Sequence, residues 1–458
     1  MLSKICYSIV LLLCPIFLLA QVPAKPTPTV PAKEKDDEVL RVNTNLIQTG
    51  ISVFDKKGNF VEGLKQDDFQ LRVDGKPVTT QFFDQISIKN PKFESRAGQS
   101  AGQASAPATR DAARTLVFVV DDMHLSAESL IRTRTMILKF VDEQMLPTDR
   151  IAVVSSGGKV GFLQQFTGDK AMLRAAANRL IYNRDMSSND FARPPMNEYD
   201  AQSIDRLDRD VLNYFIKETA TIYRVNPSQA NSMVQARVRA ILSRTQVMTS
   251  TTLSALEASV RAAGLFRGRK AIYFVTDGFL LDPGNSDTSD RLHQITDAAA
   301  RSNTVIYSFD AKGLDASMPA SENGEPPPPI AFSLQAGARF ETQDGPAYVA
   351  NNTGGQFIHN TNDLQTALNR ITTEAFTYYL LAWEPEAEIT KSNKFRRIEV
   401  SVTGRPELKV RVQNGYLPSN AVAKTEVEPV KGKSTSKNNG VVQPQPVTKQ
   451  EQPVPPGL

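Results

Sequence analysis

Hydrophobic positions divide the chain into two short alternating segments and a long central part with a different pattern. Residues 39–90 carry short apolar runs separated by turns such as Asp55-Lys-Lys-Gly58 and Asp74-Gly75. Residues 376–418 return to this pattern, with alternation in Ile398-Glu-Val-Ser-Val402. Alternation with a period of two residues between turns predicts β-strands. Because a few strands bury little core alone, we expect the two segments to pair into one Ig-like β-sandwich.

The central part, residues 114–375, alternates apolar runs with helical periodicity. Runs at 115–120, 270–275 and 304–309 are continuously apolar, which is typical of strands buried on both faces of a parallel sheet. A further strand is expected at 151–154, and helices at about 126–145, 167–180, 250–265 and 288–302. This order predicts a doubly wound, Rossmann-like α/β domain inserted in, or flanked by, the all-β domain. Residues from about 182 to 246 are predicted to form a mostly helical insertion.

The first residues have the pattern of a secretory signal peptide. Residues 1–20 combine Lys4 with an apolar run of about 12 residues, which suits an h-region and is short for a bilayer span. Cleavage is expected after Ala20 or Ala24. An uncleaved anchor is the alternative, and a lipoprotein at Cys14 is disfavoured because a leucine precedes it where a small residue is needed. Low apolar content predicts disordered linkers and a disordered tail at 21–38, 91–113 and 419–458.

Composition narrows the function classes. The chain has 53 Lys and Arg against 49 Asp and Glu, mixed along its length, so its net charge of +4 predicts no nucleic-acid partner. Its two cysteines, Cys6 and Cys14, lie inside the signal segment, which excludes a disulfide scaffold and a four-cysteine zinc site and suits an extracytoplasmic location, periplasmic or secreted. No other stretch predicts a membrane span. No nucleophile elbow or P-loop occurs, and Ser155-Ser-Gly-Gly158 fits a plain connection better than a phosphate cradle.

Acidic and hydroxyl side chains follow the ends of the predicted parallel strands. Asp121 and Asp122 come directly after the run 115–120, and Asp277 follows the run 270–275. Ser126 and Thr167 supply hydroxyls in comparable loops. Ligands of open α/β sheets bind outside the carboxyl ends of the strands, and oxygen ligands of this kind suit Mg²⁺. These five residues are therefore the candidate ligands of a divalent cation.

Each candidate also has a purely structural alternative. Ser126 precedes a predicted helix and fits an N-cap. Thr167 fits one as well, with Asp169 as its rival. Asp277 stands in Thr-Asp-Gly and fits a turn, while Asp121-Asp122 fits a solvated strand exit. The metal hypothesis depends on their occurring together at the ends of adjacent strands.

The central part also resembles a von Willebrand factor type A (VWA) domain. The matching pieces are T-L-V-F-V-V-D-D-M-H-L-S, L-P-T-D-R-I-A-V-V, F-T-G-D-K-A-M-L-R-A-A-A-N-R-L and K-A-I-Y-F-V-T-D-G. The flanking pieces V-F-D-K-K-G-N-F-V-E-G-L, T-G-G-Q-F and Y-Y-L-L-A-W-E-P resemble the VWA-related group that is typical of acidobacterial secreted proteins. The resemblance covers about 380 residues. It implies a binding or adhesion function.

The same resemblance implies where a metal-ion-dependent adhesion site would lie. That site uses D-x-S-x-S, a threonine and a later aspartate. The resemblance assigns Asp121, Thr167 and Asp277 to the aspartates and the threonine. Met123 and Leu125 stand where the two serines belong, and neither side chain is a ligand for Mg²⁺.

A register shift does not restore the motif. Asp122-x-His124-x-Ser126 recovers one hydroxyl only. The site is therefore degenerate, and we expect Mg²⁺ or another divalent cation to bind weakly, in about the millimolar range, or not at all.

These observations together predict a secreted or periplasmic interaction or adhesion module that is not an enzyme and binds an unidentified protein partner. A phospho-receiver-like signalling domain is the alternative, because V-F-V-V-D-D also resembles the acidic pair of a response regulator. The signal segment, the helical insertion and the flanking β segments oppose it. An uncharacterised enzyme is a third possibility. The oligomeric state is left open.

Overall fold

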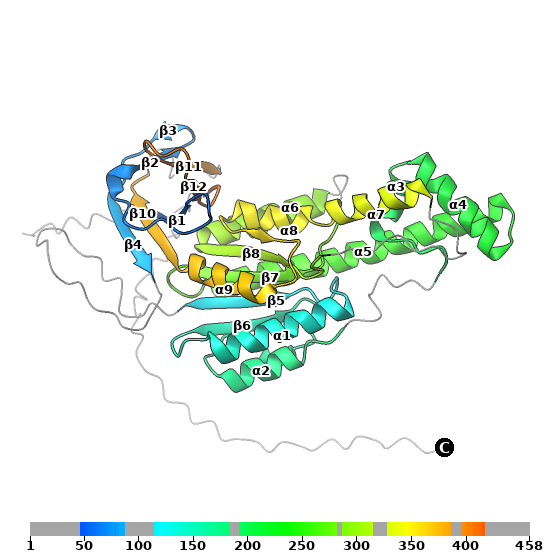
Figure 1. Cartoon of the computed structure of the whole chain (residues 1–458), viewed down its shortest axis with the longest axis horizontal. Coiled ribbons are helices and arrows are strands. Elements are labelled where there is room, and N and C mark those ends of the chain that lie inside the picture. The colour runs from blue at the N-terminus through cyan, green and yellow to red at the C-terminus, as the bar shows by residue number, and fades with distance from the viewer. Residues whose placement is uncertain are drawn as a thin grey trace, which may run out of the picture. The chain divides into compact units, whose positions relative to one another are not determined.

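The computed structural model describes six stretches of the chain, residues 46–87, 114–182, 192–281, 286–314, 328–385 and 395–416. The predicted signal peptide, both linkers and the tail lie outside them. The described chain is mixed α/β, with a parallel five-stranded sheet flanked by helices and two four-stranded antiparallel sheets (Figure 1). Among the described helices, none combines the length and the apolar composition that crossing a bilayer requires.

The five-stranded sheet is parallel throughout and has the strand order β6-β5-β7-β8-β9. Its strands are β5 (Thr115–Val120), β6 (Arg150–Ser155), β7 (Lys270–Thr276), β8 (Thr304–Asp310) and β9 (Phe357–Ile358). The chain passes from β5 to β6 on one side and continues with β7 on the other side of β5. Val120 lies beside both Ser155 and Val275, so the three strands end level. The order reverses between β5 and β7, which is where α/β sheets form a crevice.

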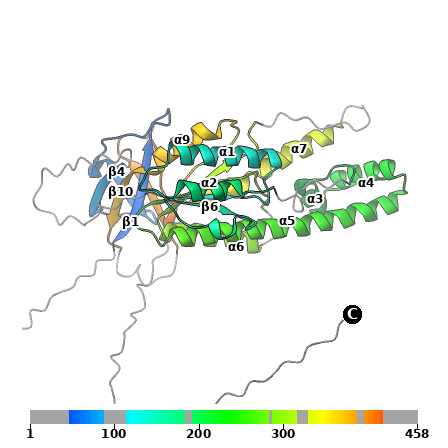
Figure 2. The same cartoon turned by 90° about the horizontal axis from the view of Figure 1, so that it is seen from below.

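Alternate residues of β5 point into two separate cores, one on each face of the sheet. Leu116, Phe118 and Val120 belong to one core, and Val117 and Val119 to the other. The first core is covered by α1 (Ala127–Glu143), α2 (Lys170–Asn178) and α9 (Leu364–Ala375). The second is covered by α5 (Pro227–Ala263), α6 (Ser286–Arg301) and α8 (Asp344–Asn352). The predicted α/β sheet with helices on both faces is confirmed (Figure 2).

The helical insertion differs from the prediction at its end. The sequence pattern predicted an insertion ending near residue 246 and a separate helix beginning near residue 250, but α5 runs through both as one helix of 37 residues. Between Ser228 and Ala263 the sequence has no glycine or proline to stop it. Several hydroxyls in this stretch donate back to their own helix and so do not interrupt it, as Thr251 Oγ1 does to the Val247 carbonyl at 2.7 Å. The helix is therefore about 55 Å long at 1.5 Å per residue.

The first half of α5 packs against three other helices at the far end of the insertion. These are α3 (Glu198–Asp205), α4 (Arg209–Tyr223) and α7 (Pro329–Glu341). Phe215 of α4, Val234 and Val238 of α5, and Leu334 of α7 share one apolar cluster there. The cluster holds α3 and α7 beside the carboxyl edge of the parallel sheet (Figure 1).

The two outer β segments pair with each other, as predicted. β1 (Ile47–Phe54) runs antiparallel to β10 (Thr377–Trp383), and β2 (Phe69–Val73) to β11 (Arg396–Val402). The two sheets have the orders β12-β1-β10-β4 and β13-β11-β2-β3. Tyr379 and Leu381 from the first sheet share a core with Phe69 and Val402 from the second. The smaller strands are β3 (Lys76–Pro77), β4 (Phe82–Ser87), β12 (Lys409–Arg411) and β13 (Gly415–Tyr416).

The β-sandwich contacts the edge of the parallel sheet where the strands begin. Arg114, just before β5, makes a bidentate ion pair with Asp149 at 2.5–2.8 Å within the α/β domain and lies at 5.8 Å over the ring of Phe376, which ends α9 and precedes β10. Arg269, just before β7, lies over the Tyr378 ring at 4.7 Å. These contacts leave the opposite edge, with the carboxyl ends of the strands, facing the helical insertion.

Candidate functional site

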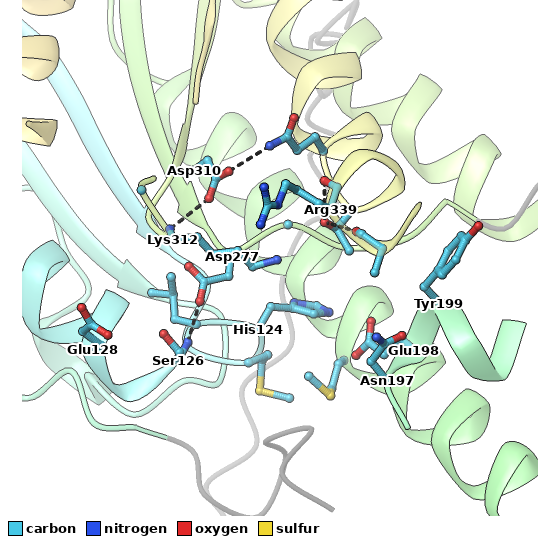
Figure 3. A pocket seen from close by; sticks show the side chains of 18 of the residues that line it. His124, Ser126, Glu128, Asn197, Glu198, Tyr199, Asp277, Asp310, Lys312 and Arg339 are labelled. Carbon is cyan, nitrogen blue, oxygen red and sulfur yellow. Dashed lines mark hydrogen bonds between the residues drawn. The ribbon is translucent and has the colours of Figure 1, made fainter. Parts of the chain in front are cut away.

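A cavity of about 600 Å³ opens at the carboxyl edge of the parallel sheet (Figure 3). Its walls come from the loop between β5 and α1, from the residues after β7 and β8, and from α3, α5 and α7. The residues that line it include polar, charged and thioether side chains, among them Met123, His124, Ser126, Glu128, Glu198, Tyr199, Met248, Asp277, Asp310, Lys312 and Arg339. The cavity lies where the strand order reverses, which is the usual position of a ligand site in such a sheet.

The Asp121 carboxylate is fully buried beside this cavity and has four hydrogen-bond partners. Its Oδ1 accepts from Thr252 Oγ1 at 2.6 Å and from Ser156 Oγ at 3.1 Å. Its Oδ2 accepts from Thr276 Oγ1 at 2.7 Å and pairs with His124 Nδ1 at 2.8 Å. Burial alone would raise the pKa of Asp121, but the His124 charge and these hydrogen bonds outweigh it and hold the pKa below its usual value.

His124 is the cation that balances Asp121. Burial disfavours its charged form, but the charges of Asp121, Glu198 and Asp277 and the hydrogen bond to Asp121 raise the pKa of His124 above its usual value. Its side chain is 3% exposed. Its Nε2 is buried against the cavity and has no hydrogen-bond partner within the described residues. The imidazolium therefore supplies a positive charge beside the first acid of the predicted metal motif.

Asp122 turns away from the cavity toward the turn after β6. It accepts from Ser155 Oγ at 2.6 Å, from Ser156 Oγ at 3.0 Å and from Gly157 N at 2.7 Å. The turn that the sequence analysis treated as a plain connection thus anchors one of the candidate acids. Both Asp121 and Asp122 are buried, so the alternative of a solvated strand exit is wrong.

Ser126 and Asp277 meet at the mouth of the cavity. Ser126 N donates to Asp277 Oδ2 at 2.8 Å, and Ser126 Oγ accepts from Ser129 N at 3.2 Å. Ser126 is therefore the N-cap of α1, which confirms its structural alternative. Asp277 Oδ1 is buried without a hydrogen-bond partner in the described part of the chain. Burial raises the pKa of Asp277 despite the opposing hydrogen bonds from Ser126 N and the Ser129 side chain and the charge of Lys312.

Thr167 does not join the other candidates. It forms an antiparallel bridge with Ile151, near the start of β6, roughly 16 Å along that strand from Ser156 at about 3.3 Å per residue. Its hydroxyl accepts from Asp169 N at 3.0 Å, and Asp169, the predicted rival, is the N-cap of α2. The structure therefore does not bring Thr167 together with Asp121 and Asp277, because the chain turns back after β6 before it reaches this residue.

The threonine that donates its hydroxyl to Asp121 is Thr252 of α5, in place of the predicted Thr167. The sequence pattern had not singled out Thr252. It shares the buried face of α5 with Leu256 and Val260. A hydroxyl one and two helical turns before two core residues was the signal available in the sequence.

Comparison with known proteins adds no relative. No family model matches the chain, and no curated protein matches it.

The residues at this site do not fit a divalent cation. The Asp121 oxygens already have four partners, and Met123 and Leu125 are buried where the family's serines would stand. Across the described ranges, no group of three or more His, Cys, Asp and Glu side chains is arranged to hold a metal ion.

The geometry also bears on the two alternative functions. A phospho-receiver needs an accessible carboxylate, whereas Asp121 and Asp122 are buried and fully engaged. The Asp121–His124 pair has the form of an oriented acid–base pair. The nitrogen that would act in such a pair is His124 Nε2, because Nδ1 is held by Asp121, and no hydroxyl or thiol of the described residues is hydrogen-bonded to Nε2. Neither alternative gains support from these contacts.

Proposed function

We propose that the chain is an exported interaction module, with a VWA-like α/β domain inserted in an Ig-like sandwich, that binds a protein partner through the cavity edge of its parallel sheet without a metal ion. One observation carries the proposal. The acid that would hold the metal is already saturated, and His124 provides the positive charge there. The cavity beside it remains open to a partner.

The surface around the cavity supports a protein partner. Three large apolar residues that are adjacent in sequence to lining residues are exposed: Ile181 (58%), Leu314 (62%) and Phe340 (70%). Exposed apolar groups around a polar cavity are typical of interaction surfaces. The sandwich contacts the other edge of the sheet, so it leaves this surface accessible.

Export is the second part of the proposal and rests on the pattern of residues 1–20. N-terminal sequencing of the mature protein should begin near Gln21 or Lys25. An intact Met1 on protein from a soluble cytoplasmic fraction would contradict it.

Site-directed photo-crosslinking tests the binding surface. One crosslinker replaces Glu128, which lines the cavity with a side chain that is 80% exposed. The control replaces Leu265, which is 86% exposed in the turn before β7 at the opposite edge. With material from the extracytoplasmic fraction, we expect a crosslinked protein from position 128 only. The crosslink should be competed by excess unlabelled chain and should persist in EDTA.

Two outcomes would contradict the proposal. Equal crosslinking from both positions, or none, would show that this edge is not the binding surface. Loss of the crosslink in EDTA would show that the interaction needs a divalent cation.

A further inference from the structure

The parallel sheet has an open edge at β9, beside a groove of about 440 Å³. Among the described strands, β9 pairs with β8 alone and is the last in the order of the sheet. The groove lies between residues 356–361, which include β9, and α9, whose side chains Thr366, Ala367 and Arg370 line it. An exposed sheet edge with a groove beside it can receive an extended peptide as an additional strand.

The hydrogen bonding to β8 determines which backbone groups of this edge point outward. Ser308 N donates to the Gln356 carbonyl at 3.1 Å. Because successive residues of a strand direct their N–H and C=O groups to opposite sides, Gln356 and Ile358 face β8. Phe357 and His359 therefore face away from it. Within the described residues, the backbone N–H and C=O groups of Phe357 and His359 have no hydrogen-bond partner.

The open edge ends where the groove meets the cavity described above. The rings of Phe357 and His359 stack with centroids 4.9 Å apart, as alternate residues on one side of an extended chain can do. The chain turns at Asn360, whose φ is 54°. Asn360 lines the cavity, whereas His359 and Thr361 on either side of it line the groove. The two sites therefore adjoin at residues 359–361.

The charged side chains of the groove are already engaged. Arg370 pairs with Glu374 at 2.9 Å, and Asp363 accepts from Thr366 N at 2.9 Å as the N-cap of α9. The groove thus offers a ligand chiefly the outward backbone of β9 and the small side chain of Ala367, so recognition depends on the ligand's backbone more than on its charge. A second copy of the chain fits poorly, because two edges as short as β9 would share few hydrogen bonds.

We propose that the protein partner adds an extended segment to β9 as a further strand of the parallel sheet, with its backbone bonded to Phe357 and His359. This inference rests on the interaction function proposed above and adds the form in which the partner binds. The segment continues from the cavity past Asn360 into the groove. Its side chains alternate between the α9 side, next to Ala367, and the opposite side, next to the two stacked rings. Proline is excluded at the bonded positions because it has no N–H.

Histidine backbone amides provide a direct test on the full chain, because the chain has only three histidines. With ¹⁵N-labelled histidine, the His359 amide reports from the sheet edge, and the amide of His293 on α6 is the internal control. The probe is the peptide Ac-Thr-Val-Thr-Val-Thr-NH2, and its control is the same peptide N-methylated at the three central nitrogens. We expect the first peptide to move the His359 signal downfield saturably, with a dissociation constant of about 1 mM. The N-methylated peptide should leave it unchanged, and neither should move the His293 signal.

Two substitutions of one residue locate the contact. Phe357→Pro removes an outward N–H without removing a bond to β8, and proline is tolerated at a sheet edge. It should weaken binding of the first peptide about tenfold, through the lost donor and the ring in the path of the incoming backbone. Phe357→Ala removes the same aromatic ring but keeps the N–H, so binding should change by less than about threefold.

A second pair of variants tests the groove from its other wall without altering β9. Thr366→Trp places a large ring in the groove from an exposed position on α9 and should weaken peptide binding about tenfold as well. Thr373→Trp, also exposed on α9 but outside the groove, should have no effect. An unchanged His293 signal shows that each variant is folded.

The proposal is overturned by equal binding of the two peptides, by equal losses in Phe357→Pro and Phe357→Ala, or by no shift of the His359 amide. A His359 amide that is already protected from hydrogen exchange in the free chain would also overturn it, because another segment or a second copy would then occupy the edge. These failures are distinct from failure of the interaction function. A partner crosslinked at position 128 without any peptide shift would remove only the added strand. Peptide binding without a crosslinked partner would remove the proposed function and leave a peptide-binding sheet edge.

Discussion

Replacing Thr252 with valine tests the buried network that occupies the predicted metal position. Thr252 is fully buried, and its Oγ1 lies 2.6 Å from Asp121 Oδ1. Valine puts a methyl group where the hydroxyl was, so the change leaves no large cavity. Asp121 Oδ1 then keeps only Ser156 Oγ, at 3.1 Å. The variant therefore isolates one hydrogen bond to a buried charge.

The expected cost follows from that charge. A hydrogen bond to a charged group contributes about 1.5–3 kcal/mol, so the free energy of unfolding should fall by about 2 kcal/mol at pH 7. The pKa of Asp121 is lower in the folded protein than its ordinary value of 3.8. Its stabilising contribution is therefore present above pH 3.8 and lost as the pH falls through the folded pKa. The deficit of Thr252→Val should be constant at neutral pH and narrow as the pH falls through the pKa of Asp121 in the folded variant.

Urea denaturation followed by circular dichroism measures this difference. The matched control is Thr251→Val, because Thr251 Oγ1 bonds only to the Val247 carbonyl of its own helix. Its free energy of unfolding should change by less than about 0.5 kcal/mol. Equal losses in the two variants, or a Thr252→Val deficit that does not narrow in acid, would refute the reasoning.

Further predictions concern groups away from the cavity. Burial lowers the pKa of Lys270 to about 8, so Lys270→Met should raise the free energy of unfolding at pH 7 by about 2 kcal/mol, a gain that shrinks from pH 8 toward 10.5. Burial raises the pKa of Asp200 to about 6, so Asp200→Asn should stabilise the fold more at pH 7 than at pH 4; equal urea midpoints would contradict either prediction. A Cβ on Gly355 would lie 1.9 Å from the Ile306 carbonyl oxygen, so Gly355→Ala should lower the melting temperature far more than Gly58→Ala, where φ is +85° but space is open.

The strands and their polar ends could be predicted well because a strand that is buried on both faces is a continuous apolar run in the sequence. A continuous apolar run such as Thr115–Val120 indicates a buried strand when regular helical patterns lie between the runs. Since parallel strands end at one edge, Asp121 and Asp277 could be expected to lie close together. That β5 and β7 are neighbours, with β6 on the other side, is a property of the folded sheet and has no local signal.

The errors arise where side-chain direction depends on distant contacts. Thr167 follows β6 in sequence but lies at the start of that strand in space. His124 stands between two residues of the expected motif, and only the fold shows that its ring turns toward Asp121 and fills the place of a cation. The length of α5 was missed for a different reason, since the hydroxyl-rich stretch before Thr252 resembles a break unless its helical back-bonding is known.

The pairing of β1 with β10 has a consequence for the order in which the molecule can form. Gly50 pairs with Leu380, and both neighbours of β1, β10 and β12, follow the entire α/β domain in the sequence. During synthesis β1 emerges long before either neighbour exists, and an unpaired strand edge is prone to aggregation. Once the α/β domain folds, it brings its own two ends together and acts as a short tether between the strands, which removes most of the entropy cost of closing so long a loop. The central domain is therefore expected to template the sandwich, and a chain that stops before residue 377 would leave β1 without a strand to join.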